Sequence, residues 1–162
     1  MTKPLLRLDR LDRRILAELQ QDGSLTNQQL AERVGLSPSP CLRRVKALEE
    51  AGIILRRVTL LERKMLGLSL TVLLAIGMDR HTPERFEGFE RDIAAIDEVL
   101  ECYLVTGQQA DYMLKLVVPD MDSYQQLLLN RITRIPGVSG VHSSFVLRRV
   151  VDRTELPLGY LA

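Results

Sequence analysis

The sequence predicts an α+β chain of two domains, with three helices in the first domain and a β-α-β-β-α-β series in the second. Three observations predict this organisation. Residues 1–64 hold 13 Lys and Arg against 8 Asp and Glu, whereas residues 65–162 hold 9 against 13. Apolar residues recur at helical spacing up to residue 52, and β-branched runs alternate with helical segments after residue 68. The basic first part indicates a domain that faces a polyanion, with a merely solvated surface as the alternative.

The first helix is expected within the segment LDRLDRRILAELQQDG. Asp9 and Asp12 suit its amino-terminal turn, and Gly23 follows its end as a C′ residue would. Its apolar positions recur at helical spacing and are Leu11, Ile15, Leu16 and Leu19. One face of this helix is therefore expected in the core of the first domain.

A second, shorter helix is expected between Thr26 and Gly35. Thr26 and Gln29 have the spacing of a capping box, so Thr26 is the expected N-cap. Leu30 and Val34 lie on its buried stripe. Gly35 is expected to end this helix after little more than two turns.

The third helix is expected to run from Ser37 to Gly52. Ser37 can cap it, and Pro38 suits the first helical position. The N–H that Pro40 lacks would have had no intrahelical partner so close to the start of the helix. The two prolines therefore indicate where the helix begins.

Two short helices joined by a glycine-containing turn, with a third helix before them, form the helix-turn-helix pattern. On a helical wheel of about 100° per residue, Cys41 shares a core face with Val45 and Leu48. Arg44 lies to one side, where it could reach a phosphate or pair with a local carboxylate. The opposite face could be an ordinary solvated surface or a reading surface, and it holds Ser39, Arg43, Lys46 and Ala47.

This pattern predicts double-stranded DNA as a partner. Recognition helices present their first turns to base edges in the major groove, where Arg pairs with guanine and Ser contacts several bases. The start of the second helix could bind phosphate through free amides. The DNA-reading motif is expected over about residues 27–46. The candidate DNA-binding residues are Thr26, Asn27, Gln28, Ser37, Ser39, Pro40, Arg43, Arg44, Lys46 and Ala47.

The segment IILRRVTLLERK, which begins at residue 53, is expected to form a strand or wing and then a connection. Its β-branched and apolar residues favour a strand. Arg56 and Arg57 could add contacts to the DNA backbone or could simply be solvated. The first domain is thus expected to be a winged helix-turn-helix domain over residues 8–69.

The second domain, residues 70–158, is expected to have the ferredoxin-like βαββαβ arrangement. The strand at 68–79 is apolar on both faces, so helices would cover one face of the sheet and leave the other face apolar. The simplest partner for an apolar sheet face is a second copy of the chain, so a homodimer is expected. The other elements are expected as a helix at 82–96, strands at 99–107 and 112–120, a helix at 121–137, and a last strand after it.

Composition and motifs exclude several other classes of protein. The longest apolar run, Leu70–Met78, is too short to cross a bilayer, and the N-terminus lacks a signal-peptide run, so a cytoplasmic protein without a membrane partner is expected. Cys41 and Cys102 lack disulfide or metal-ligand spacing. His81 and His142 are isolated in the sequence and catalytic motifs are absent, so no enzyme, metal site or cofactor is expected.

Three phrases of the sequence closely resemble the Lrp/AsnC (feast/famine) family of bacterial and archaeal transcription regulators. They are LDRRILAELQQDG, LAERVGLSPSPCLRRVKALEEAGII, and ECYLVTG followed by DYMLKLVVPDM. The resemblance spans about residues 8–158. It implies a DNA-binding domain followed by a ferredoxin-like domain that dimerises, commonly assembles into octamers, and binds a free amino acid at interfaces between copies. The implied function is sequence-specific transcription regulation in response to a small effector.

The resemblance places the effector loop at VTGQQADY. Family members usually carry G-x-x-D there, whereas this chain has one more residue between Gly107 and Asp111. Gly107 would permit close approach of the backbone, and Asp111 could pair with the ammonium group of a ligand. The alternative is an ordinary hairpin loop in which Asp111 caps its own turn. The candidate effector residues implied by the resemblance are Gly107, Gln108, Asp111, Met121, Ser143, Ser144, Val146 and Thr154.

A second interpretation is an architectural, nucleoid-like protein that wraps DNA without a ligand. The loop around Asp111 favours the regulator over this alternative. A ligand that binds the native protein alone would raise its unfolding midpoint and so separate the two interpretations.

Overall fold

The structure, a computed structural model, describes residues 8–107 and 110–161. It divides into two compact units. We call residues 8–60 with 151–161 the helical unit, and residues 61–150 the sheet unit. Each unit has its own hydrophobic core.

The C-terminal segment, which was expected in the second domain as far as residue 158, is grouped with the other unit in this division. The C-terminal segment belongs to the helical unit, because Leu158 packs against that unit's core. Two side chains of the first helix also hold its backbone. Arg13 Nη1 donates to the Leu161 carbonyl at 2.7 Å, and the Gln20 side chain exchanges hydrogen bonds with the N–H and the carbonyl of Leu156. The chain therefore returns to the helical unit after it completes the sheet unit.

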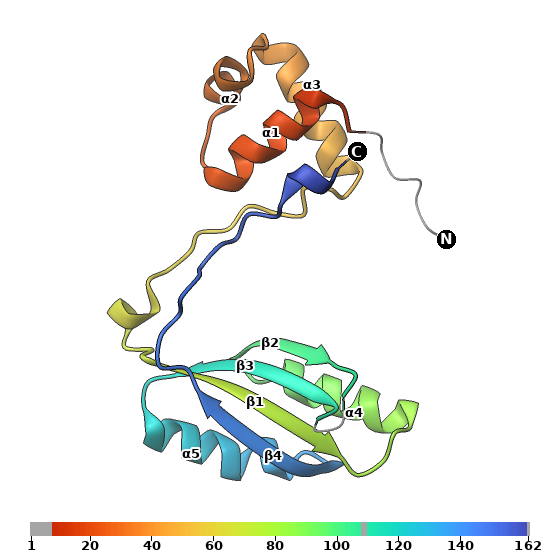
Figure 1. The fold of residues 1–162 in the computed structure, drawn as a ribbon, viewed down its shortest axis with the longest axis vertical. Helices are drawn as coiled ribbons and strands as arrows, with labels where there is room; N and C mark the ends of the chain where they lie inside the picture. The colour runs from red at the N-terminus through yellow and green to blue at the C-terminus, as the bar shows by residue number, and fades with distance from the viewer. Residues whose placement is uncertain (1–7, 108–109, 162) are drawn as a thin grey trace. The chain divides into compact units, whose positions relative to one another are not determined.

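Three helices form the predicted helix-turn-helix arrangement of the helical unit: α1 (Arg10–Gln21), α2 (Asn27–Val34) and α3 (Pro38–Glu50) (Figure 1). Cys41 is fully buried, which confirms its predicted place in the core. None of the helices in the described part of the chain is long and apolar enough to cross a membrane. The buried core residues of this unit are Ile15, Leu16, Leu30, Ala31, Val34, Cys41, Val45 and Leu48.

The predicted helix starts are confirmed in position, and one predicted cap is wrong in detail. Asp9 caps α1 in a capping box with Asp12, and Thr26 caps α2 in a capping box with Gln29. Ser37 is the N-cap residue of α3, but its side chain makes no capping hydrogen bond. A serine in this position bonds the second or third amide of the helix, and the third residue of α3 is a proline without an N–H.

The predicted helix ends are also confirmed in position. Gly35 and Gly52 follow α2 and α3 with φ angles of 73° and 75°, a left-handed conformation that favours glycine. Gly23 follows α1, but its φ is not positive. There the Asp22 carboxylate accepts hydrogen bonds from the N–H and the hydroxyl of Ser24, and this side chain organises the turn instead.

The strand expected after residue 53 is not formed in the described chain. Within the described chain, residues 55–62 have no strand pairing, and a short 3₁₀ helix, Arg63–Leu66, follows them. Leu55 and Leu60 are exposed. The segment is extended, but no neighbouring strand completes a ladder with it. The connection that was predicted for the second half of this segment therefore begins earlier.

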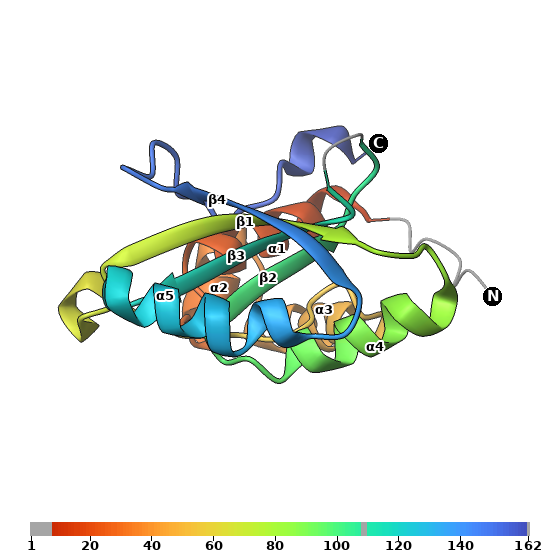
Figure 2. The ribbon, with the colours of Figure 1, turned by 90° about the horizontal axis from the view of Figure 1, so that it is seen from below.

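The sheet unit has the predicted order of elements and confirms the ferredoxin-like βαββαβ fold. Its strands form one antiparallel sheet in the order β2-β3-β1-β4, and both helices lie against the same face of the sheet (Figures 1 and 2). The elements are β1 (Leu70–Met78), α4 (Pro83–Ala94), β2 (Val99–Leu104), β3 (Tyr112–Val118), α5 (Met121–Asn130), a 3₁₀ turn (Ile132–Arg134) and β4 (Val138–Phe145).

The register of the strands decides which face of the sheet each side chain takes. Leu74 of β1 pairs with Ser143 of β4, and Leu74 is buried in the core beneath the helices. The next row contains Leu73, paired with Lys115 of β3 and Ser144 of β4, and it faces away from the helices. We call this second surface the open face.

The open face is less apolar than the sequence predicts. Leu73 and Tyr103 are exposed large apolar side chains. Beside them, Lys115 Nζ and Glu101 Oε1 form an ion pair 2.6 Å apart. A partner on this face would therefore meet charged groups as well as apolar surface.

Candidate functional site

The outward face of α3 gathers the side chains that the sequence predicts to read DNA. They lie opposite the buried side of the helix, so packing leaves them exposed to solvent. Their close spacing follows from their positions one and two turns apart on one helix. The exposed residues that line a single shallow pocket there are Ser39, Leu42, Arg43, Lys46, Ala47 and Glu50.

Arg43 and Lys46 are the cations of this surface. Within the described residues, neither forms an ion pair or a hydrogen bond. Ser39 and Ala47 beside them are small, so another backbone can approach closely. This is the chemistry that a base edge or a phosphate requires, since Arg can donate to guanine O6 and N7 and Lys can meet a phosphate.

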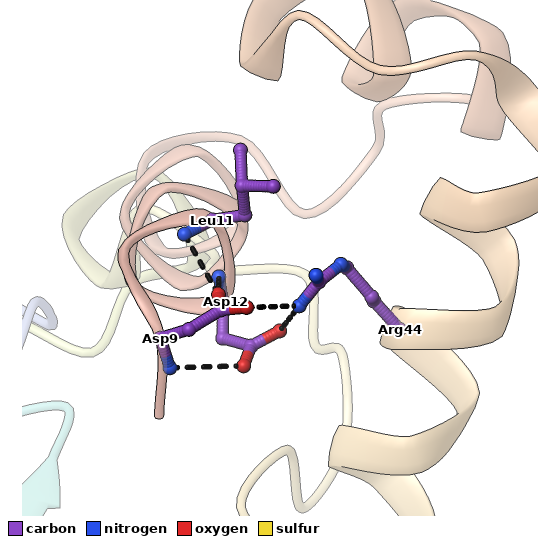
Figure 3. Close-up of polar contacts among 4 residues, drawn as sticks. All are labelled: Asp9, Leu11, Asp12 and Arg44. Atoms are coloured by element: carbon purple, nitrogen blue, oxygen red, sulfur yellow. Dashed lines mark hydrogen bonds and ion pairs between the residues drawn. The ribbon is translucent and has the colours of Figure 1, made fainter. Parts of the chain in front are cut away.

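Arg44 differs from its neighbour Arg43. Its Nη1 atom lies 2.8 Å from Asp9 Oδ2 and 2.7 Å from Asp12 Oδ1 (Figure 3). Of the two predicted partners, phosphate or local carboxylate, the structure shows the carboxylate. Arg44 is half-buried at the junction of α3 with the amino-terminal end of α1.

The predicted phosphate-binding residues at the start of α2 divide into two kinds. Asn27 Nδ2 donates to the Pro38 carbonyl at 2.8 Å, so this side chain joins α2 to α3. The Thr26 hydroxyl is engaged with Gln29 in the capping box. Gln28 is exposed to solvent. Of the three predicted residues, Gln28 is therefore the one whose side chain is directed to solvent rather than to a partner in the chain.

The first turns of α2 and α3 also differ in their free amides. Prolines at the first and third positions of α3 leave Ser39 as the source of an N–H there. In α2, the first two amides belong to Asn27 and Gln28, and the side-chain cap binds the third. The start of α2 is therefore the better site for a phosphate oxygen. Ser37 is exposed and Pro40 is half-buried at the start of α3.

The predicted effector loop lies between β2 and β3. Gly107 is exposed, its φ is not positive, and a Cβ added to it would meet no described atom within 4 Å. Packing within the described residues therefore does not explain a glycine at position 107. Gln108 lies outside the described residues.

The Asp111 carboxylate is held from two sides. Its Oδ2 accepts the N–H of Met78 at 2.7 Å, and its Oδ1 lies 2.8 Å from Nε2 of His81. Its backbone N–H donates to the Ile76 carbonyl at 2.8 Å. Within the described residues, the Asp111 carboxylate ties the loop to the end of β1. A ligand's ammonium group would have to join or displace these partners.

Ser143 and Ser144 are separated by the pleat of β4. The Ser143 hydroxyl is hydrogen-bonded to the hydroxyl of Tyr124 on α5, beneath the sheet. Burial raises the pKa of Tyr124. Ser144 is exposed on the open face. One small ligand bound on a single face of the sheet therefore meets one of these serines and not the other.

Met121 and Val146 lie at the end of the sheet opposite to the effector loop. Met121 begins α5 just after β3 ends, whereas Asp111 precedes the start of β3. The Val146 N–H donates to the carbonyl of Thr71, near the start of β1. Thr154 belongs to the helical unit. The predicted effector residues are therefore not gathered in one place within the sheet unit.

Sequence reasoning did not identify the three partners that engage two of the predicted residues, Arg44 and Asp111. Asp9 and Asp12 engage Arg44, and His81, which the sequence presents as isolated, pairs with Asp111. Distance along the sequence hides such pairs, because β1 and β3 become neighbours only when the sheet forms. Within the described residues, no group of three or more His, Cys, Asp and Glu side chains is placed to hold a metal ion.

Two family models match the chain. A winged helix-turn-helix DNA-binding model matches residues 8–54, and the Lrp/AsnC ligand binding domain model matches residues 71–156. The chain belongs to the Lrp/AsnC family. This conclusion agrees with the two units of the fold, since the helical unit carries the first match and the sheet unit carries most of the second.

Known proteins of the Lrp/AsnC type are similar to this chain over almost its whole length. It is 44% identical over 149 residues to the leucine-responsive regulatory proteins of Escherichia coli and Salmonella typhimurium, covering 92% of this chain and 90% of each relative. A transcriptional regulator from Neisseria meningitidis, solved in complex with L-Met, superposes with a TM-score of 0.91 at 39% identity, covering 96% of this chain and 99% of that one. An AsnC family regulator from Agrobacterium tumefaciens gives 0.90 at 39% identity, covering 96% and 100%.

The combination of the two domains defines what this Lrp/AsnC protein does. It is a DNA-binding transcription regulator that responds to a ligand such as an amino acid. The presence of a ligand-binding domain disfavours the architectural alternative, in which DNA is wrapped without a ligand. Its relatives are regulators, which agrees with the expectation of a protein that is not an enzyme.

Proposed function

We propose that this regulator reads its operator with the outward face of α3. The observation that carries the proposal is the surface on which Arg43 and Lys46 face solvent without a partner in the described chain, next to the small residues Ser39 and Ala47. Arg43 donates to a guanine in the major groove, Ser39 contacts a neighbouring base, and Lys46 meets a phosphate. The first amides of α2 bind a phosphate of the same strand and fix the register. Its partner is double-stranded DNA, and we place the protein in the cytoplasm.

The experiment begins by selecting a duplex from a random DNA library with the full-length protein. Arg43→Ala should lower affinity for that duplex by about tenfold to a hundredfold and relax the preference at one base pair. Arg33→Ala is the matched control, because it removes the same charge from an exposed arginine of α2 that pairs with Glu18. Gel-shift titrations between about 50 and 200 mM salt measure both variants. If Arg43→Ala and Arg33→Ala behave alike, the α3 face is not the reading surface.

For the effector, we propose a neutral amino acid with an aliphatic side chain. The names of similar proteins support this class, since they include a leucine-responsive protein and a regulator solved with L-Met. Its ammonium group lies near Asp111, and its carboxylate takes amides of the loop that begins at Gly107. The aliphatic side chain lies against the apolar residues Met121 and Val146 of another copy.

The length of the sheet supports a site that two copies share. Asp111 and Met121 flank opposite ends of β3, a strand of 7 residues. Such a strand spans about 20 Å, whereas one residue of backbone spans about 3.5 Å. A single amino acid therefore cannot reach both groups within one chain. We propose that the chain forms homodimers through the open face of the sheet, and that dimers join further, to octamers, around the effector loops.

Two measurements on the full-length protein test these proposals. A thermal-shift screen of the twenty amino acids should raise the unfolding midpoint most with leucine or methionine, and little with glutamate or lysine. Sedimentation should show a dimer or larger assembly that Leu73→Glu shifts toward monomer, because Leu73 is exposed on the open face. A midpoint that no amino acid moves would count against the effector proposal, and a monomeric parent protein would count against the shared site.

A further inference from the structure

A three-residue charge cluster joins the start of α1 to the middle of α3 (Figure 3). Asp9 uses one oxygen to cap α1, where Oδ1 accepts the N–H groups of Leu11 at 2.8 Å and of Asp12 at 2.9 Å. Asp12 uses one oxygen in the same capping box, where Oδ2 accepts the Asp9 N–H at 3.1 Å. The other oxygen of each carboxylate accepts from the same atom, Nη1 of Arg44. Each carboxylate therefore bonds both to its own helix and to α3.

Burial makes this cluster more than a surface ion pair. Asp12 is 9% exposed and is the one charged residue that is buried in the described part of the chain. A carboxylate that is buried without a cation is strongly destabilising, so Asp12 requires Arg44 in the folded protein. Nη1 of Arg44 is thereby held at the junction of α1 and α3. This requirement distinguishes Arg44 from Arg43, whose exposed side chain has no partner within the described chain.

The geometry of α3 explains why such a contact matters. Its buried side consists of Cys41, Val45 and Leu48, and apolar contacts of this kind are not directional. Its start carries no side-chain capping bond. Charge-assisted hydrogen bonds are directional, so the bonds of Arg44 fix the rotation of α3 about its own axis relative to α1. A rotation of one residue step, about 100°, separates Arg44 from Arg43.

We propose that Arg44 is a positioning residue that holds α3 in the orientation that aims Arg43 and Lys46 at the bases, and that it does not itself contact DNA. This inference rests on the proposed function, in which α3 is the reading helix. It assigns different roles to two neighbouring arginines. Arg43 contacts the operator, and Arg44 acts through Asp9 and Asp12.

The direction in which Asp12→Asn changes DNA binding tests the inference. Asp12→Asn keeps the size of the side chain and an oxygen for the capping box, but it removes the charge that holds Arg44. Electrostatics alone predicts stronger DNA binding, because a negative charge is removed from a DNA-binding unit. A positioning role predicts the opposite. Discrimination between the selected duplex and a shuffled duplex should fall about tenfold, with an unchanged dependence of affinity on salt.

Arg44→Gln supplies the second arm of the test. It should lower discrimination at least as much as Asp12→Asn, because Arg44 also bonds to Asp9, and the double variant should lose no more than Arg44→Gln alone. Asp22→Asn is the matched control, since it changes the same residue type at the other end of α1, where its partner is Ser24. Asp22→Asn should leave discrimination unchanged. All titrations are made well below the measured unfolding midpoint of each variant, so that a loss of folded protein does not enter the affinity.

Two results would overturn the inference. If Asp12→Asn binds as well as the parent or better, while Arg44→Gln flattens the salt dependence by about one counterion, Arg44 contacts a phosphate. If discrimination is unchanged in Asp12→Asn and in Arg44→Gln and only the unfolding midpoints fall, the cluster serves folding alone. Arg43→Ala in the same assay tests the reading face separately. If it leaves discrimination intact, the proposed function fails at Arg43, whatever the result at Arg44.

Discussion

The two units hold their functional side chains in opposite ways. In the helical unit, Arg43 and Lys46 face solvent without a partner in the described chain. In the sheet unit, Asp111 and Ser143 are already bonded to other side chains of the same unit. The difference follows from the ligands. A polyanion is attracted to exposed cations, so one chain can carry a complete surface, whereas a small molecule must be enclosed by convergent groups. The proposed DNA surface therefore lies within one chain, whereas the proposed effector site needs a second copy.

The largest expected effect tests whether the two units are independent. Phe89 is fully buried in the sheet unit, where its ring lies 4.6 Å from that of Tyr112. Phe89→Ala should lower the stability of this unit by about 3–5 kcal/mol because it leaves a cavity. Leu48→Ala is the counterpart in the core of the helical unit. Scanning calorimetry should show each variant lowering a different transition. A common shift of both transitions would show that the units unfold together.

The second prediction concerns the bonds that already engage Asp111. Asp111→Ala should cost the sheet unit about 1–3 kcal/mol, because the Met78 N–H loses its acceptor. Asp111→Asn keeps an acceptor and removes the charge, so it should cost less stability. Both variants should lose the effector response and keep the DNA affinity of the parent. A full effector response in Asp111→Asn would show that the charge is needed for neither binding nor signalling.

Acid should weaken both units through their helix caps, by less than the Asp111→Ala substitution. The Asp12 N–H, supported by Arg44, lowers the pKa of Asp9, and the Ser123 N–H lowers the pKa of Asp120. A lowered pKa in the folded state gives stability that is present above the unfolded pKa of about 3.9 and is lost as the pH falls through the folded value. Unfolding midpoints measured from pH 6 downward should therefore fall as the pH passes below the unfolded pKa toward the folded pKa of these aspartates. Asp120→Asn should flatten this fall in the sheet unit and leave the helical unit unchanged.

The smallest expected effect on stability is at Gly107. A Cβ there would meet no described atom and the φ is not positive, so Gly107→Ala should change stability by less than about 0.5 kcal/mol. If the loop receives a ligand or a second copy, the same methyl group should weaken the effector response. Equilibrium unfolding and an effector titration measure the two quantities separately. A loss of stability without a loss of response would remove Gly107 from the site.

The helical unit was the more predictable of the two units. Its caps, its glycine ends and the buried place of Cys41 are local consequences of helical periodicity, and the structure confirms them. The failures have local physical causes as well. Ser37 lacks a capping bond because a proline stands where the amide should be, and the strand expected after residue 53 has no neighbouring strand to pair with.

The effector residues were less predictable because a sheet joins residues that are distant in the sequence. The pairing of β1 with β3 brings Asp111 to Met78 and His81, and the pleat of β4 separates Ser143 from Ser144. Thr154 proved to belong to the helical unit. A resemblance to a family assigns roles to positions in the sequence. It does not show which other side chains the residues at those positions contact in this chain.

The sequence by itself determined the family, the order of the elements and the outward face of α3. Hydrophobic periodicity, caps and turn residues act over a few residues, so they can be read along the chain. Only the tertiary structure decided which charged groups are free and which are engaged. Arg43 and Arg44 are adjacent and chemically identical, yet folding brings Asp9 and Asp12 to one of them and leaves the other in solvent. The reason is the rotation of about 100° between neighbouring residues of a helix, which directs two equal side chains toward different surroundings.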